Sequence, residues 1–227
     1  MIKALFNLIF PPACLGCDQF LKENEAVICT HCRHEIPLTN QHLHPENEAS
    51  IKFYGRLPLE HISTLMYFHK KGIVQDLIHN LKYRGHQEVG NLFGNWYGFE
   101  LQNCENLKTV DAIIPIPLHR KKLRKRGYNQ VTTFGESLSN QLNCPFEEAI
   151  LQRTQYNNTQ TFKNLLGRNE IKSHTFQVHF NETHHNKHFL LIDDVMTTGA
   201  TLEAAGKALL EIPGARLSIV CMAMSQS

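Results

Sequence analysis

Hydrophobic and polar positions follow two periods along most of the chain, one typical of strands and one typical of helices. Short apolar runs of strand length are mostly followed by longer segments whose apolar residues recur every three or four positions. This alternation predicts an α/β fold with a mainly parallel sheet flanked by helices. The predicted strands span residues 63–69, 109–118, 188–195 and 216–224, and the predicted helices span residues 72–83, 128–142 and 201–212.

The strand predicted at 188–195 ends in two adjacent carboxylates, Asp193 and Asp194. Its continuous apolar start is typical of a strand covered on both faces. A Thr-Thr-Gly turn follows at once and leads into the predicted helix. Open α/β sheets bind their ligands at the carboxyl ends of strands, so this turn is a candidate ligand site.

The turn after the two acids combines features that favour an anion. It offers backbone N–H groups, threonine hydroxyls and a helix N-terminus, which together suit a phosphate monoester. The ordinary alternative is an acidic strand end followed by a helix N-cap at Thr198 or Thr201. The segment lacks the lysine of a P-loop, which argues against a nucleoside triphosphate. It also lacks the G-x-G-x-x-G motif, which argues against a dinucleotide.

Composition limits the remaining possibilities. The chain has 227 residues, of which 42% are hydrophobic and 19% charged, enough for one main domain with a full core and a small additional module. A formal net charge of +2 means that any nucleic-acid binding must depend on a local basic patch. The apolar runs are too short for a membrane span, and the N-terminus lacks a signal-peptide cleavage site, so we expect a cytoplasmic protein.

Four of the seven cysteines form two closely spaced pairs, Cys14-x2-Cys17 and Cys29-x2-Cys32, with eleven residues between the pairs. Two such pairs predict a structural Zn2+ site, because each presents two thiolates from one tight turn. Two disulfides or a redox pair are the alternatives, and His31 or His34 is an alternative ligand.

Residues 38–50 are polar and aperiodic, which indicates a linker or long loop. The predicted domains are therefore an N-terminal zinc-binding module with its linker, residues 1–50, and a larger α/β domain, residues 51–227.

The run LLIDDVMTTGAT, residues 190–201, resembles the signature with which type I phosphoribosyltransferases bind phosphoribosyl pyrophosphate, PRPP. The resemblance implies that Asp193 and Asp194 are catalytic residues that contact the ribose hydroxyls, with Mg2+ bound alongside PRPP. It also implies a type I phosphoribosyltransferase fold for the larger domain. The residues expected to hold the 5'-phosphate are Thr197, Thr198, Gly199, Ala200 and Thr201.

Taken in order, several segments resemble the ComF family, the competence-associated, phosphoribosyltransferase-like group of bacteria. This resemblance implies a PRPP-binding protein linked to DNA uptake in natural transformation, with DNA-uptake machinery as partners. The alternative is a competence protein that binds single-stranded DNA and uses the fold without phosphoribosyl transfer. No residue is assignable as a general base, and the acceptor stays open. The segments are the two cysteine pairs, KYRGHQEVGNLFG (82–94), IPIPLHRKKLRKRGYNQ (114–130), RTQYNNTQTFKNLLGRNEI (153–171) and the PRPP motif.

The basic run HRKKLRKRG, residues 119–127, occupies the place of the pyrophosphate loop in type I phosphoribosyltransferases. Arg124 and Arg126 are the candidate contacts, because a guanidinium binds phosphate through two parallel hydrogen bonds. The same cations also suit a single-stranded DNA backbone, and a solvated charged loop is the third alternative. In related enzymes a hood over the ligand lies near residues 153–170; a surface helix is the alternative there.

Overall fold

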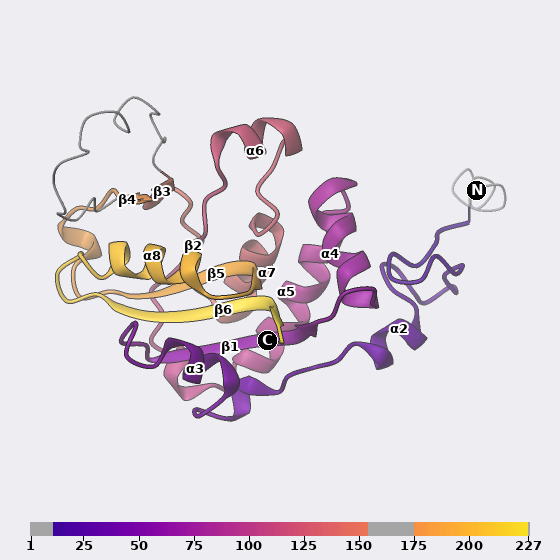
Figure 1. The fold of residues 1–227 in the computed structure, drawn as a ribbon, viewed down its shortest axis with the longest axis horizontal. Coiled ribbons are helices and arrows are strands. Elements are labelled where there is room, and N and C mark those ends of the chain that lie inside the picture. Colours follow the sequence, from indigo (N-terminus) through magenta and orange to yellow (C-terminus); the bar gives the residue numbers. More distant parts are fainter. Residues whose placement is uncertain (1–10, 154–174, 227) are drawn as a thin grey trace, which may run out of the picture.

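The computed structural model describes residues 11–153 and 175–226, and its centre is a four-stranded parallel sheet (Figure 1). The strand order is β1-β6-β5-β2, and each neighbouring pair runs parallel. The α/β fold with a parallel sheet is therefore confirmed. The strands are β1 (His61–Phe68), β2 (Ala112–Pro115), β5 (His188–Met196) and β6 (Arg216–Ser225).

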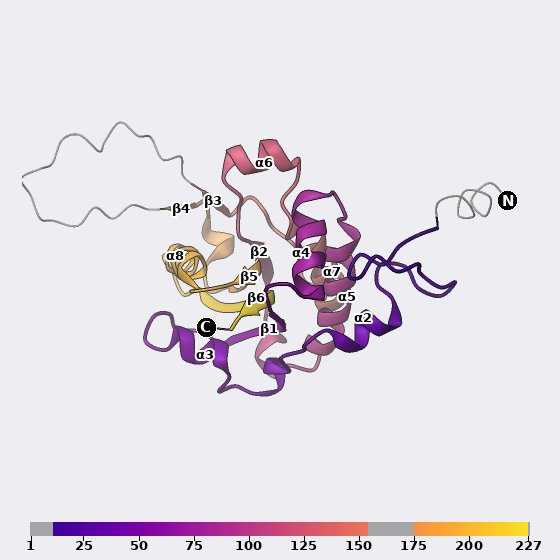
Figure 2. The same ribbon diagram turned by 45° about the vertical axis from the view of Figure 1, so that its right-hand side comes forward.

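Helices cover both faces of the sheet, which makes three layers (Figure 2). Successive side chains of a strand point to opposite faces, so Leu190 and Ile192 pack with one helix layer and Leu191 with the other. The first layer consists of α4 (Ile73–Tyr83), α5 (Glu88–Leu101) and α7 (Thr132–Leu142), and the second of α3 (Glu48–Phe53) and α8 (Ala200–Leu209).

Every strand and helix predicted from periodicity is present, with shifted ends. β2 is shorter than predicted and stops at Pro115. The Ile116 N–H still donates to the Ile192 carbonyl of β5 at 2.9 Å, and Pro117 then has no N–H to continue the ladder. Helix α5 is an addition that the pattern did not predict. Its Gly90, Gly94 and Gly98 face α7, and a Cβ at Gly94 would lie 2.6 Å from the Phe134 carbonyl oxygen, so glycine permits this close packing.

Two segments that the sequence analysis describes as loops are ordered. The basic run forms helix α6 (Arg120–Arg126), which has no buried residue and ends at Gly127 with φ +86°. The linker prediction for residues 38–50 is wrong in part, because the segment contains η1 (Gln41–Leu43) and the start of α3. The buried Asn47 amide donates to the Ile62 carbonyl at 2.9 Å, and the buried Gln41 carbonyl accepts from Thr64 N–H at 3.1 Å. The proposed domain boundary at residue 50 stays a prediction.

The remaining elements are short. Almost all of the hood segment, from residue 154, lies outside the described residues. No helix in residues 11–153 or 175–226 has the length and apolar character needed to cross a membrane. The short elements are α2 (Thr30–Glu35), η2 (Glu105–Leu107), η3 (Glu182–His184) and an antiparallel pair of β3 (Leu151–Arg153) and β4 (Phe176–Val178).

Candidate functional site

The Thr-Thr-Gly turn lies between the carboxyl end of β5 and the N-terminus of α8, as the sequence predicts. Gly199 is the N-cap of α8 with φ +76°, a backbone conformation that favours glycine. The Thr198 hydroxyl oxygen accepts from Ala200 N–H at 3.4 Å, whereas the N–H groups of Thr201 and Leu202 make no hydrogen bond within the described chain. These N–H groups and the helix dipole form an anion-binding arrangement.

Asp193 and Asp194 lie on opposite faces of β5 because they are successive strand residues. Asp193 lines a small cavity of about 40 Å3 together with residues 195–202, the turn and first part of α8. Asp194 does not line that cavity, and its side chain is directed toward Lys82 of α4 and Gln130, which precedes α7. Only Asp193 therefore stands beside the Thr-Thr-Gly turn, residues 197–199, which is called the phosphate turn below after its predicted ligand.

Asp194 is 5% exposed and is the centre of a network of polar side chains. One carboxylate oxygen, Oδ1, accepts from the Lys82 ammonium at 2.7 Å, and the other accepts from the Gln130 amide. Arg126, at the end of α6, donates to the Gln130 side-chain carbonyl. The network thus connects the acidic strand end to α4 and to the basic helix, and both Asp194 oxygens already have protein partners.

Burial raises the pKa of the Asp193 carboxyl to about 8, and the neighbouring Asp194 carboxylate adds to this effect. The N–H of Asp194 donates to Asp193 Oδ1 at 2.8 Å and opposes the shift. A raised pKa favours the protonated form of Asp193 near neutral pH. The carboxyl group then offers a donor as well as an acceptor to a sugar hydroxyl.

Helix α3 and the residues after it hold the phosphate turn from the side of the second helix layer. The Arg56 guanidinium donates to the Thr198 carbonyl at 3.0 Å and to Glu203 on α8 at 2.9 Å. The Phe53 ring lies against Gly199, so closely that a Cβ at that glycine would be 2.6 Å from its Cζ. The position of the turn therefore depends on residues more than 140 positions earlier in the chain.

The two candidate arginines of the basic helix have different surroundings. Arg126 is part of the Asp194 network, and its Cζ lies 5.4 Å from the centroid of the Tyr83 ring. Arg124 is exposed, and its side chain makes no hydrogen bond or ion pair with residues 11–153 and 175–226. Tyr83 is 67% exposed, so its ring and the Arg126 guanidinium lie side by side at the surface, with the further cations of α6 before them in the chain.

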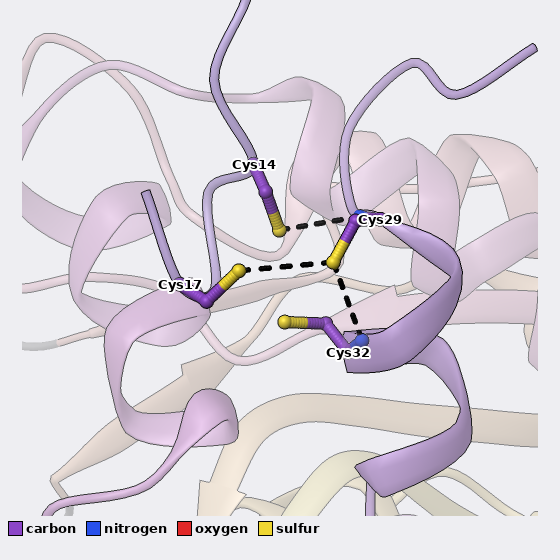
Figure 3. Close-up of side chains that lie close together, drawn as sticks. All are labelled: Cys14, Cys17, Cys29 and Cys32. Carbon is purple, nitrogen blue, oxygen red and sulfur yellow. Dashed lines mark hydrogen bonds between the residues drawn. The ribbon is translucent and has the colours of Figure 1, made fainter. Parts of the chain in front are cut away.

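The four paired cysteines converge on one point near α2, as Figure 3 shows. All four sulfur atoms lie within 4.8 Å of one another, and Cys17 Sγ is 3.7 Å from Cys29 Sγ. A tetrahedral zinc with bonds of about 2.3 Å requires sulfur separations of roughly 3.8 Å, which matches this arrangement. The ligand set is thus four thiolates, and all seven cysteines are free of disulfides.

Backbone N–H groups prepare Cys14 for metal binding. Burial of its thiol opposes ionisation, but N–H donors from Cys29, Gly16 and Cys17 outweigh burial and lower the pKa of Cys14 to about 7. The N–H of Cys29 is 3.2 Å and that of Gly16 3.4 Å from Cys14 Sγ. Such donors stabilise a thiolate, the form that binds zinc. The donor set therefore fits structural zinc.

Two family models match separate parts of the chain. Residues 5–43 match the double zinc ribbon domain, and residues 132–226 match the phosphoribosyl transferase domain. The second match includes β5, the phosphate turn and α8, whereas Lys82 and the basic helix α6 precede it. The two matches agree with the four-cysteine cluster and with the parallel sheet, and they confirm the expected zinc module and phosphoribosyltransferase fold.

Several curated proteins are similar to this chain. "DNA utilization protein YhgH" of Escherichia coli O157:H7 is 27% identical over 149 residues, which cover 64% of this chain and 65% of that protein. "Competence protein F" of Haemophilus influenzae is 32% identical over 115 residues, 50% of each chain. "Competence protein ComFC" of Bacillus subtilis is 27% identical over 139 residues, 61% of this chain and 54% of that protein. These matches confirm the resemblance to the ComF family.

The site contains residues that motif comparison did not assign. The motifs assign no role to Lys82 or to Gln130. Both directly contact Asp194, from 112 and 64 positions earlier in the chain. Both lie in segments that resemble the ComF family, Lys82 as the first residue of KYR and Gln130 as the last of YNQ. Their place in these segments, close to the ends of predicted helices, is the only signal in the sequence.

Proposed function

From the phosphoribosyl transferase match and the geometry of the turn, we propose that this protein binds PRPP at residues 197–201 and transfers its phosphoribosyl group, with release of pyrophosphate. The observation that carries the proposal is the N-terminus of α8, where unbonded N–H groups and an αL glycine stand beside Asp193. The 5'-phosphate would accept from these N–H groups and from the threonine hydroxyls. The acceptor nucleophile is not part of the proposal.

Asp193 is assigned to the ribose hydroxyls because it lines the same cavity as the turn. Asp194, the second acid of the signature, reaches the ligand side only by exchanging its bonds to Lys82 or Gln130. Released from that bond, the Lys82 ammonium would be free to contact the pyrophosphate, whose charge grows as the glycosidic bond breaks. Mg2+ bound with PRPP would supply further neutralisation of the pyrophosphate, and the oxygen donors beside the turn suit that cation.

Thermal unfolding with PRPP and Mg2+ tests this binding. At a ligand concentration of 100 times Kd, stabilisation of about 2.7 kcal/mol corresponds to a rise in Tm of roughly 5–10 °C for a chain of this size. Asp193→Asn should reduce the rise, whereas Asp111→Asn, a matched change in an acid paired with Lys187 before β2, should retain it. No shift for the wild type would overturn the PRPP site. Assay of pyrophosphate release with candidate acceptors tests transfer separately.

A second function, binding of single-stranded DNA by α6, is favoured by one observation. The helix carries six Lys and Arg residues, none buried, and the Cζ of its Arg126 lies 5.4 Å from the centroid of the exposed Tyr83 ring. Cations that track phosphates and an aromatic ring that stacks a base are the usual parts of such a surface. The relatives named for competence and DNA utilization provide the biological context, and we extend to this chain their implied role in DNA uptake.

The different surroundings of the two arginines separate the two functions experimentally. Arg124→Ala should weaken binding of a labelled oligonucleotide, with a smaller salt dependence, and leave the PRPP-induced rise in Tm unchanged. Arg126→Ala should weaken both, because Arg126 also holds Gln130 in the Asp194 network. Unchanged oligonucleotide affinity in the Arg124→Ala, Arg126→Ala double variant would show that α6 is not a DNA-binding surface.

A further inference from the structure

A cavity of about 830 Å3 lies on another part of the molecule from the phosphate turn. It is formed by residues of the segment 42–62 together with the end of α5 and residues 103–106. It shares no residue with the small cavity at Asp193 and the turn. The volume is within the range of roughly 300–1,000 Å3 that is usual for small-molecule sites.

The register of the sheet places this cavity near the amino ends of the strands. His61, the first residue of β1, pairs with Ser218, whereas Asp193 of β5 pairs with Cys221. Three residues of strand correspond to about 10 Å, and the phosphate turn lies beyond Asp193 at the carboxyl ends. The cavity is therefore a separate place in the fold and not an extension of the proposed PRPP site.

Hydrogen bonding determines which ring nitrogen of His61 carries the proton. The fully buried Tyr97 hydroxyl has one partner among the described residues, and it donates to Ser63 Oγ at 2.7 Å. Ser63, also fully buried, must then donate its own proton to His61 Nε2, 2.7 Å away. A neutral imidazole that accepts at Nε2 carries its proton at Nδ1.

His61 therefore offers an N–H donor toward the cavity. Its Nδ1 has no partner within the described chain and is not sealed from solvent, since no buried side-chain nitrogen there lacks a hydrogen bond. Burial, together with the nearby His42 and His188, lowers the pKa of His61 to about 4, so the ring is neutral near pH 7. The donor is consequently an uncharged N–H group, which does not attract anions strongly.

The charged groups of the cavity wall are mainly acidic. Glu100 accepts from the Trp96 indole at 2.8 Å through one oxygen, while its other oxygen is 3.7 Å from His42 Nδ1, too far for a hydrogen bond. Glu60 adds a carboxylate, and Glu105 adds another that is paired with Lys108 at 2.5 Å. Arg56, the one Lys or Arg among the described lining residues, is already bound to Glu203 and to backbone carbonyls.

We propose that this cavity binds a flat nitrogen heterocycle that carries an amino group and no phosphate. A ring nitrogen would accept from His61 Nδ1–H, and the amino group would donate to the free Glu100 oxygen. The apolar side chains of Leu43 and Tyr54, lining residues that are 65% and 90% exposed, supply the wall against which a ring packs. The acidic lining disfavours nucleotides and other anions.

One segment connects this cavity to the phosphate turn. Phe53 and Arg56 line the cavity, and the same residues contact Gly199 and the Thr198 carbonyl. A ligand that orders residues 53–57 would therefore also order the turn, which would raise the affinity of a second ligand there. This consequence rests on the proposed function, whereas binding in the cavity does not.

Three related ligands test the chemistry of the cavity in the full chain. Adenosine presents the required acceptor nitrogen beside an amino group, inosine presents the reversed pattern, and AMP adds a phosphate. Titration calorimetry should show adenosine binding, with inosine and AMP each about tenfold weaker or more, the equivalent of one lost hydrogen bond or one repulsive contact. AMP or inosine binding as tightly as adenosine would overturn the proposal, as would absence of adenosine binding.

Variants locate the site. Glu100→Gln should weaken adenosine about tenfold while keeping the acceptor for Trp96, and Asn103→Trp, a change at an exposed lining residue, should block it. Asp193→Asn should leave adenosine binding unchanged. Normal binding to the Asn103→Trp variant would refute the location. The effect of adenosine on the PRPP-induced rise in Tm is a separate readout, so failure of the PRPP site would leave the direct titration interpretable.

Discussion

Replacing Gly199 by alanine is a sharp test of how the phosphate turn is held. Gly199 has φ +76°, and a Cβ there would lie 2.6 Å from Phe53 Cζ and 2.9 Å from Cε2. Gly127, at the end of α6, has a similar φ of +86° but nothing within 4 Å of the added atom. An alanine would therefore be strained by a left-handed backbone conformation at both positions, but only at Gly199 would its Cβ also clash with a side chain, that of Phe53.

The expected free energies of unfolding follow from these two terms. Alanine in the left-handed region costs about 1–2 kcal/mol, reduced by the smaller entropy of its unfolded chain, so Gly127→Ala should lose about 1 kcal/mol. Gly199→Ala carries the same loss and, in addition, about 1–3 kcal/mol for forcing Phe53 out of its position. The difference between the two variants should thus be about 1–3 kcal/mol.

Urea unfolding of the zinc-loaded protein measures both losses on the same scale. Unequal midpoints with equal slopes would give the difference directly. Phe53→Leu in the Gly199→Ala background should return part of the loss, because the smaller side chain makes room for the methyl group. Equal destabilisation by Gly199→Ala and Gly127→Ala would refute the reasoning that Phe53 holds the turn.

Three further predictions follow from the site. In urea titrations, Asp193→Asn should stabilise the protein more at pH 8.5 than at pH 5. The native pKa of Asp193 is raised to about 8, so between about pH 4 and pH 8 the unfolded chain binds fewer protons than the native protein. The wild type therefore loses stability over that range, and the asparagine variant does not. Lys82→Met should lower the free energy of unfolding by about 3 kcal/mol, because it leaves the buried Asp194 carboxylate without its cation. The same change in the Asp194→Asn background should cost much less, and equal costs in the two backgrounds would show that the ion pair does not stabilise the protein. Purified protein should contain near-stoichiometric zinc, and a chelator should lower Tm by several degrees; metal analysis that found none would end the zinc assignment.

The local pattern was sufficient for the main elements because each strand and helix has a periodic apolar face. It failed where that face was absent or misleading. Helix α5 carries three glycines, which lower helix propensity, and its packing on α7 depends on those same glycines. The segment 38–50 looked like a linker because it is polar, yet the buried side chains of Gln41 and Asn47 bond to β1.

The sequence by itself determined the four strands of the sheet, the three helices with a periodic apolar face, the two cysteine pairs and the position of the turn after Asp193 and Asp194. These features are local, since they depend on residues within one element or one turn. Only the tertiary structure decided that the two acids face opposite sides of β5, that Lys82 and Gln130 occupy both oxygens of Asp194, and that Phe53 and Arg56 hold the turn. The physical reason is that such contacts form between side chains more than 60 positions apart, whose meeting is set by the packing of whole elements and leaves no periodic signal in the chain.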